Sequence, residues 1–164
     1  MSKLLVVIDV QNGFINEHSE WLVPKLCEYI KGSDYTKVVA TRYLNDKETP
    51  CYKYLNWEGC MTPEEYALVP EVRELVYRVF DKYTYTSVTN SLFAYMGAVN
   101  FDEIHLCGID AGCCVIATAY DLFDKGFNVK VIPDLCAVVG DFPNYLEAVR
   151  YQLRQNVPCL EIAK

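Results

Sequence analysis

The stretch "EIHLCGIDAGCCVIATAYDLFDKGFNVKVIPDL", residues 103–135, contains two apolar runs on either side of a segment with helical periodicity. The first run covers residues 103–109 and the second covers residues 127–135. Between them, residues 113–125 form a helical pattern that ends at Gly126. A strand, a helix and a second strand in this order predict a crossover between two parallel strands of one sheet.

Apolar runs of the same kind occur along the rest of the chain. Further strands are predicted at residues 3–9, 37–44, 74–82 and 157–163, and further helices at residues 24–31, 91–99 and 145–155. Because crossovers between parallel strands are right-handed, this pattern predicts a Rossmann-like α/β fold, a three-layer αβα sandwich with a six-stranded parallel sheet. No linker rich in Gly, Ser and Pro divides the chain, so residues 1–164 are expected to form one domain.

The charge and composition of the chain argue against several classes of protein. The net charge is −7, from 22 acidic and 15 basic residues, and no basic cluster offers a site for a phosphate backbone, so nucleic acid is not an expected partner. The first apolar run is too short for a signal peptide or a membrane span, so a cytoplasmic protein without a membrane partner is expected. The eight cysteines include no CxxC pair and are expected to be reduced thiols.

Residues that can carry out chemistry follow several of the predicted strands. In an open parallel sheet, ligands bind beyond the carboxyl ends of the strands. Asp9, Arg42, Lys82 and the turn at residues 110–114 occupy such positions. Cys114 falls at the predicted start of a helix, where free N–H groups and the helix dipole lower the pKa of a thiol. The same N–H groups can bind an oxyanion, which makes this thiol a candidate nucleophile.

Each of these side chains also has a purely structural interpretation. Asp9 fits a turn or a helix cap, Lys82 can pair with the neighbouring Asp81, and a cysteine can serve as a small buried residue. His105 lies in mid-strand, where a hydrogen-bonded core imidazole is expected, and His18 lies in a polar loop. A Cys–His dyad is therefore disfavoured. Asp9 is left as the proton acceptor, with Lys82 as its electrostatic partner.

Three motifs identify a family resemblance. "VVIDVQNGF" (6–14), "FDKYTYTSV" (80–88) and "CGIDAGCCVIATAYDLF" (107–123) together resemble the isochorismatase-like cysteine hydrolases, the group that includes nicotinamidases. The resemblance implies a catalytic triad of Asp9, Lys82 and Cys114. It also implies a cis peptide between Ile109 and Asp110, an oxyanion hole formed by the backbone N–H groups of Asp110 and Cys114, and a homo-oligomer, either a dimer or a tetramer.

The sequence departs from the family pattern in three places. Nicotinamidases carry a histidine-rich metal site after the second strand, whereas "TRYLNDKETPCYKY" (41–54) has no histidine, so no metal and no other cofactor is expected. Ala111 and Gly112 stand where relatives often have Thr and Asp, which removes side chains that could brace the reactive turn. Asp110 adds a carboxylate close to the thiol, where a like charge opposes thiolate formation. Its side chain is therefore predicted to point away from the sulfur or to pair with a cation, while its backbone N–H serves the oxyanion.

The irregular stretch at residues 45–66 is too long for a routine connection and is expected to line or cover a pocket. Aromatic residues with a few polar groups in and around it suit a small, flat or apolar amide. The candidate substrate-binding residues are Gln11, Phe14, Arg42, Tyr43, Trp57, Tyr83 and Tyr85. The alternative is that many of these side chains pack the loop down or form a subunit contact.

The sequence therefore leaves several functions open. The first is a cysteine hydrolase that acts on a small carboxamide or related C–N bond through an acyl-thioester on Cys114, without a metal. The second is cleavage of a vinyl ether such as that of isochorismate; some relatives with this activity lack the cysteine, so Cys114 favours the first. The third is a non-catalytic ligand-binding or thiol-redox protein that uses Cys113 and Cys114 as a pair, although adjacent cysteines form only strained disulfides.

Overall fold

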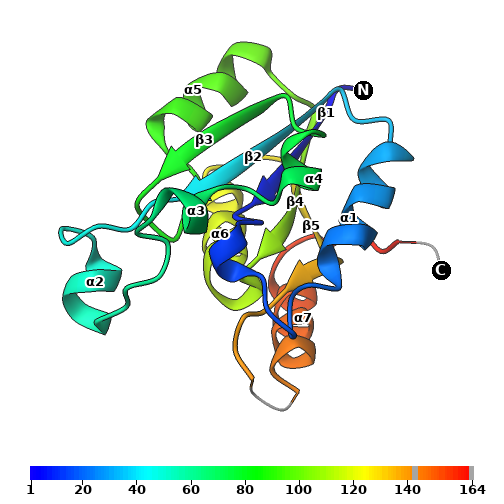
Figure 1. The fold of residues 1–164 in the computed structure, drawn as a ribbon. Coiled ribbons are helices and arrows are strands. Elements are labelled where there is room, and N and C mark those ends of the chain that lie inside the picture. The colour runs from blue at the N-terminus through cyan, green and yellow to red at the C-terminus, as the bar shows by residue number, and fades with distance from the viewer. Residues whose placement is uncertain (142–143, 163–164) are drawn as a thin grey trace.

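A computed structural model of the protein describes residues 1–141 and 144–162. In the part of the chain that it describes, five strands form one parallel sheet in the order β3-β2-β1-β4-β5 (Figure 1). The strands are β1 (Lys3–Ile8), β2 (Lys37–Tyr43), β3 (Arg78–Lys82), β4 (Glu103–Ile109) and β5 (Val129–Ala137). Their parallel pairing confirms the α/β class that the crossover pattern predicts.

The prediction of a sixth strand at residues 157–163 is wrong. The described part of this segment meets β5 through one bridge, between Val131 and Cys159, and two backbone hydrogen bonds flank it. Pro158 has no N–H to extend a ladder, so the contact ends there. Residue 163 lies outside the described residues. The C-terminal segment covers the edge strand without adding a strand to the sheet.

Helices cover both faces of the sheet and make three layers. One face packs against α1 (Leu22–Lys31) and α4 (Pro70–Arg73). The other packs against α5 (Asn90–Val99), α6 (Ile116–Asp124) and α7 (Tyr145–Asn156), as Figure 1 also shows. Alternate residues of each strand supply the two apolar cores, and the central strands β1 and β4 are almost fully buried. No helix in residues 1–141 and 144–162 is long and apolar enough to cross a membrane.

Several elements differ from the sequence-based prediction at their ends. The helix predicted at residues 113–125 instead begins as a π-helical turn, Ala111–Val115, and continues as α6. Strand β5 runs to Ala137, two residues beyond the predicted end, because it continues past Pro133 as an edge strand. Helix α1 starts two residues before the predicted residue 24.

The stretch at residues 45–66 holds two short helices, α2 (Pro50–Leu55) and α3 (Pro63–Tyr66). Each begins with a Thr-Pro pair, in which the threonine side chain accepts a hydrogen bond from a backbone N–H of the first turn. Thr62 also forms a capping box with Glu65. In Figure 1, α2 stands apart from the sheet, whereas α3 lies close to it.

Strands β1 and β4 approach each other most closely next to the reactive turn. Gly108 pairs with Ile8 and has a φ of +126°, and a Cβ added to it would lie 2.1 Å from the carbonyl oxygen of Ile8. The register between β4 and β5 also shifts between Leu106 and Gly108. A glycine is required at this position because no side chain fits the φ or the space.

We predict that Gly108→Ala lowers the free energy of unfolding by about 3 kcal/mol or more, since backbone strain and overpacking each cost about 1–3 kcal/mol. The matched control is Gly97→Ala in α5, where an added Cβ meets no atom within 4 Å. That variant should gain up to about 1 kcal/mol from helix propensity. Urea unfolding curves of both variants test the prediction, and equal midpoints would contradict it.

Candidate active site

Three titratable side chains meet at the carboxyl edge of the sheet. The Lys82 Nζ atom lies 2.8 Å from Asp9 Oδ2 and 3.4 Å from the Cys114 Sγ atom. Asp9 follows β1, Lys82 ends β3, and Cys114 lies in the π-helical turn after β4. The side chains of Asp9 and Lys82 are fully buried, and Cys114 is 6% exposed. The fold thus brings together the three residues that the motifs select from distant parts of the chain.

Asp9 is held by its backbone and by a threonine. It has a φ of 51°, in the left-handed region that Asp tolerates better than most residues, so the chain turns sharply at the end of β1. Its Oδ1 atom accepts a hydrogen bond from Thr41 Oγ1 at 2.7 Å, and Thr41 in turn lies 3.3 Å from Ser87 Oγ. One carboxylate oxygen is thereby fixed by Thr41, and the other contacts Lys82.

Lys82 is a buried cation with several partners. Besides Asp9 and Cys114, its Nζ atom donates to the carbonyl oxygens of Thr84 at 2.8 Å and Tyr85 at 3.1 Å. Burial lowers the pKa of Lys82, but the Asp9 carboxylate and the Cys114 sulfur raise it more, so the ammonium form is favoured. The pairing of Lys82 with its neighbour Asp81 does not occur, because Asp81 binds Arg42 instead.

Cys114 is a protonated thiol in the resting site. Burial and the nearby Asp9 carboxylate raise its pKa well above the usual value, and Lys82 opposes this only in part. The sequence-based expectation that a helix start lowers this pKa is therefore wrong for the unliganded protein. The thiol lies inside a π-helical turn two residues before α6, and burial is the largest cause of its raised pKa. Lys82 contacts both the Asp9 carboxylate and the thiol, which makes Asp9 the candidate acceptor for the thiol proton.

The turn before Cys114 contains a cis peptide between Ile109 and Asp110. The Asp110 carboxylate accepts hydrogen bonds from the N–H of Gly112 at 2.8 Å and from the N–H of Val139 at 2.9 Å. These bonds hold both carboxylate oxygens on backbone N–H groups. The orientation of the Asp110 side chain relative to the sulfur stays a prediction. Among the described residues, the N–H groups of Asp110 and Cys114 donate to nothing outside this turn.

A cavity of about 370 Å³ opens above Cys114. Its wall is mainly aromatic and aliphatic, and Trp57 stacks on Phe14 with ring centres 5.8 Å apart and planes at 6°. The lining residues are Gly13, Phe14, Tyr43, Cys51, Leu55, Trp57, Tyr85, Asp110, Cys113, Cys114 and Val139. In the described part of the wall, Asp110 is the one carboxylate and no Lys or Arg is present. The pocket therefore suits a small uncharged molecule.

Four of the predicted substrate-binding residues, Phe14, Tyr43, Trp57 and Tyr85, line this cavity. The other three do not. Gln11 is buried and bonds the backbone N–H and carbonyl of Tyr43, which fixes the end of β2. Arg42 points away from the cavity because neighbouring side chains of a strand face opposite ways, and it binds Asp81 on the outer surface. Tyr83 is 51% exposed outside the wall.

Other residues of the site were missed by the sequence analysis. Thr41 carried a signal, since a hydroxyl near the end of an otherwise apolar strand indicates a buried polar partner. A second signal concerned Cys51 and Leu55, because the Thr-Pro pair at residues 49–50 predicts the start of the helix on which both lie. Val139 carried none, because its contribution depends on the loop after β5.

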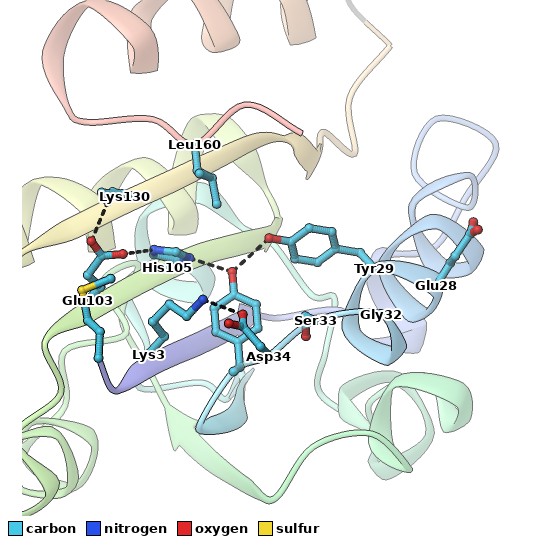
Figure 2. A pocket seen from close by; sticks show the side chains of 12 residues that line it. Lys3, Glu28, Tyr29, Gly32, Ser33, Asp34, Glu103, His105, Lys130 and Leu160 are labelled. Carbon is cyan, nitrogen blue, oxygen red and sulfur yellow. Dashed lines mark hydrogen bonds and ion pairs between the residues drawn. The ribbon is translucent and has the colours of Figure 1, made fainter. Parts of the chain in front are cut away.

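The two histidines lie outside this site. His105 is in a second, larger cavity of about 490 Å³ at the amino edge of the sheet. Its Nε2 atom lies 2.9 Å from Glu103, which also binds Lys130 (Figure 2). Its Nδ1 atom lies 2.6 Å from the hydroxyl of Tyr35. Burial lowers the pKa of His105 more than Glu103 raises it, so the imidazole is neutral and Tyr35 donates to it. The expectation of a hydrogen-bonded core imidazole is confirmed.

All eight cysteines are free thiols in the described residues. Across residues 1–141 and 144–162, no three His, Cys, Asp or Glu side chains are grouped in a way that could hold a metal ion. The expectation of a metal-free, cofactor-free site stays a prediction.

Comparison with known proteins identifies the family. The family model described as "Isochorismatase domain" matches residues 3–156. The chain belongs to the isochorismatase family. The resemblance that the three motifs indicate is thereby confirmed. Members of this family are hydrolases that act on amides and related bonds.

The isochorismatase fold is also evident from solved structures. An isochorismatase-like hydrolase from Alkaliphilus metalliredigens has a TM-score of 0.82 at 18% identity, over 98% of this chain and 95% of that chain. PnC1 from L. infantum in complex with nicotinate has a TM-score of 0.82 at 20% identity, over 99% of this chain and 96% of that chain. N-carbamoylsarcosine amidase from Thermoplasma acidophilum has a TM-score of 0.78 at 21% identity, over 98% of this chain and 95% of that chain. At these identities the likeness establishes the fold.

Curated relatives are longer than this isochorismatase domain. Isochorismatase domain-containing protein 2 of Xenopus laevis is 38% identical over 74 residues, which cover 43% of this chain and 36% of that protein. The secreted isochorismatase effector Isc1 of Phytophthora sojae is 29% identical over 136 residues, which cover 81% of this chain and 60% of that protein. The match thus spans 36% of the length of the first relative and 60% of the length of the second.

The charges around Cys114 predict how its alkylation by iodoacetamide depends on pH. Because the thiol pKa is raised well above 9.0, the rate of labelling should keep rising beyond pH 9. Asp9→Asn removes an anion that raises this pKa and should shift the profile to lower pH. Lys82→Met removes the cation that lowers it and should shift the profile to higher pH.

Mass spectrometry of the labelled peptide measures the rate for Cys114, with the partly exposed Cys159 in the same sample as an internal control. The Cys159 profile should be unchanged in both variants. A Cys114 profile that neither variant moves would show that the three side chains do not interact.

Proposed function

We propose that this protein is a cysteine-dependent hydrolase that cleaves a small, uncharged carboxamide or related C–N bond through an acyl-thioester on Cys114. One observation carries the proposal: the buried Lys82 ammonium joins a buried carboxylate to a thiol that lines an apolar cavity. A nucleophile within reach of a base, with a third group holding both, is the arrangement that nucleophilic catalysis requires.

In the first half of the reaction, the Cys114 sulfur attacks the amide carbon as Asp9 accepts the thiol proton. The new C–S bond moves the carbonyl electron pair onto oxygen, and the backbone N–H groups of Asp110 and Cys114 donate to this oxyanion. When the intermediate collapses, the C–N bond breaks and Asp9 returns the proton to the leaving nitrogen. The products of this half are an amine or ammonia and an acyl-thioester.

In the second half, Asp9 removes a proton from water as the water oxygen attacks the thioester carbon. The C–S bond then breaks, the carboxylic acid leaves, and the proton returns to sulfur. Lys82 stays protonated throughout and offsets the negative charge that alternates between Asp9 and Cys114. The high pKa of the resting thiol means that proton transfer accompanies attack, so a free thiolate does not accumulate before substrate binds.

The charge of the cavity supports an uncharged amide over an isochorismate-type substrate, which carries two carboxylates. Carboxylates in binding sites are usually paired with Arg or Lys. The described wall holds neither, Arg42 is turned outward, and Lys82 is occupied by four partners. N-carbamoylsarcosine amidase, a protein of similar fold, is by its name an amidase, which also supports C–N bond cleavage.

Cellular location and assembly stay predictions. The sequence favours the cytoplasm, whereas the name of the Phytophthora relative describes a secreted protein. The homo-oligomer is implied by the family resemblance, and the exposed Tyr54 and Leu55 of α2 offer apolar surface for such a contact.

We predict that the protein releases amine or ammonia from uncharged aromatic amides such as nicotinamide or benzamide, and much more slowly from amides that carry a carboxylate. Cys114→Ser should lower kcat/KM by about a thousandfold or more, because it removes the nucleophile. Ammonia release measured across a panel matched in size tests both statements.

The control for the nucleophile is Cys159→Ser, in the C-terminal segment, which should retain the wild-type rate. A protein that binds these amides but hydrolyses none of them would contradict the proposal. Faster turnover of the carboxylate-bearing amides would contradict the proposal that the substrate is uncharged.

A chelator tests the metal independence of this reaction. Amide hydrolysis should be unchanged after treatment with EDTA and dialysis, because the proposed steps use only Asp9, Lys82, Cys114 and backbone N–H groups. The measurement is the rate before and after treatment, with added Zn²⁺ as the reverse test. A loss of activity that Zn²⁺ restores would contradict the prediction.

A further inference from the structure

The Asp110 side chain connects two segments that surround the cavity. Its Oδ1 atom accepts from the N–H of Gly112 inside the reactive turn, and its Oδ2 atom accepts from the N–H of Val139 in the loop after β5. Both bonds are shorter than 3 Å. Hydrogen bonds to an ionised carboxylate are about twice as strong as neutral ones. One side chain therefore fixes the turn relative to the opposite wall of the pocket.

The Val139 peptide is also held from its other side. Its carbonyl oxygen accepts from Asn16 Nδ2 at 3.0 Å, and Asn16 Oδ1 accepts from the N–H of His18 at 2.9 Å. Asn16 belongs to the segment that follows β1 and Asp9. A continuous chain of hydrogen bonds thus runs from the loop after β1, through the loop after β5, to the turn that carries Cys114.

The opposite side of the turn is packed against helix α7. A Cβ added to Gly112 would lie 2.1 Å from the hydroxyl of Tyr145, so Gly112 allows the turn to approach this helix. Ala111 and Gly112 themselves have no side-chain polar groups. The Asp110 carboxylate thus supplies two bonds that neither following residue in the turn can make.

The position of Asp110 imposes two opposing requirements. In the proposed mechanism its own N–H donates to the oxyanion, whereas its carboxylate must be kept from the same developing negative charge. Two backbone donors at 2.8 Å and 2.9 Å engage both carboxylate oxygens and meet the second requirement. Burial, Asp9 and Lys82 are the largest causes of the shift in the Cys114 pKa. The effect of Asp110 on the turn can therefore be measured beside its effect on the thiol.

We propose that Asp110 is a positioning residue, whose carboxylate holds the oxyanion-binding turn in its reactive geometry through Gly112 and Val139. This inference rests on the proposed cysteine hydrolase function. It assigns to the Asp110 side chain the hydrogen bonds that stabilise the turn, which Ala111 and Gly112 cannot provide.

The test compares two reactions of Cys114 in Asp110→Asn. This variant keeps one acceptor oxygen but sets an NH₂ group against a backbone N–H. Acylation by p-nitrophenyl acetate forms an oxyanion, whereas alkylation by iodoacetamide forms none. Acylation should fall about tenfold to a hundredfold, in line with the loss or displacement of an oxyanion donor. Alkylation should stay within about twofold to threefold of the wild-type rate, since burial, Asp9 and Lys82 are the main causes of the shift in the thiol pKa.

Two further variants complete the experiment. Asn16→Ala removes the outer bond to Val139 and should lower acylation in the same direction, by less than Asp110→Asn. Asp121→Asn changes a carboxylate that binds Thr86 and Lys125 away from the cavity, and it should leave both rates unchanged. Thermal unfolding of each variant checks that the fold is retained.

The possible results separate the inference from the function on which it rests. A wild-type protein whose Cys114 is not acylated overturns the proposed function and the inference with it. A wild-type protein that is acylated, with Asp110→Asn acylated equally fast, overturns the inference alone. Equal losses of acylation and alkylation in Asp110→Asn also overturn it, because they indicate a general loss of structure.

Discussion

The site depends on the burial of the Lys82 ammonium between Asp9 and Cys114. Removing an ammonium from water costs several kcal/mol, so it stays charged in the interior only when well-placed partners offset that cost. Here those partners come from strands β1 and β3 and from the turn after β4. The strand order β3-β2-β1-β4-β5 puts these segments near one another, and Lys82 reaches past β2 to meet them. The central part of the sheet and the candidate active site therefore require the same arrangement of the chain.

The cavity and the turn restrict the site in complementary ways. The aromatic wall formed by Phe14, Tyr43, Trp57 and Tyr85 removes water from the thiol, which raises its pKa and makes electrostatic interactions stronger. The turn supplies polar groups only from its backbone, while the one carboxylate in the described wall is bonded to N–H groups. The side chains thus set the shape of the cavity, and the backbone of the turn sets the polarity next to the thiol.

Much of this could be predicted from the sequence, because it depends on local signals. Continuous apolar runs gave the parallel strands, and the rule that ligands bind at their carboxyl ends led to Asp9, Lys82 and Cys114. The prediction failed where pairing or orientation decides the outcome. Residues 157–163 have the composition of a strand, but their described part, residues 157–162, makes one bridge. Arg42 lies near the end of a strand, as the site residues do, but its side chain binds Asp81. The thiol pKa was also beyond a sequence argument, since burial sets it and burial is a property of the whole fold.

The lack of a Lys or Arg in the described wall of the cavity has a consequence for turnover. Hydrolysis of a neutral amide yields an acid that ionises at neutral pH. The newly formed anion would find an apolar wall that holds no Lys or Arg in its described part, with the Asp9 carboxylate buried near the thiol. Its departure into water would therefore be favoured by charge, whereas the uncharged starting molecule gains from the aromatic surface. On the proposed chemistry, the same pocket that admits the substrate disfavours retention of the product, so inhibition by the acid would be weak.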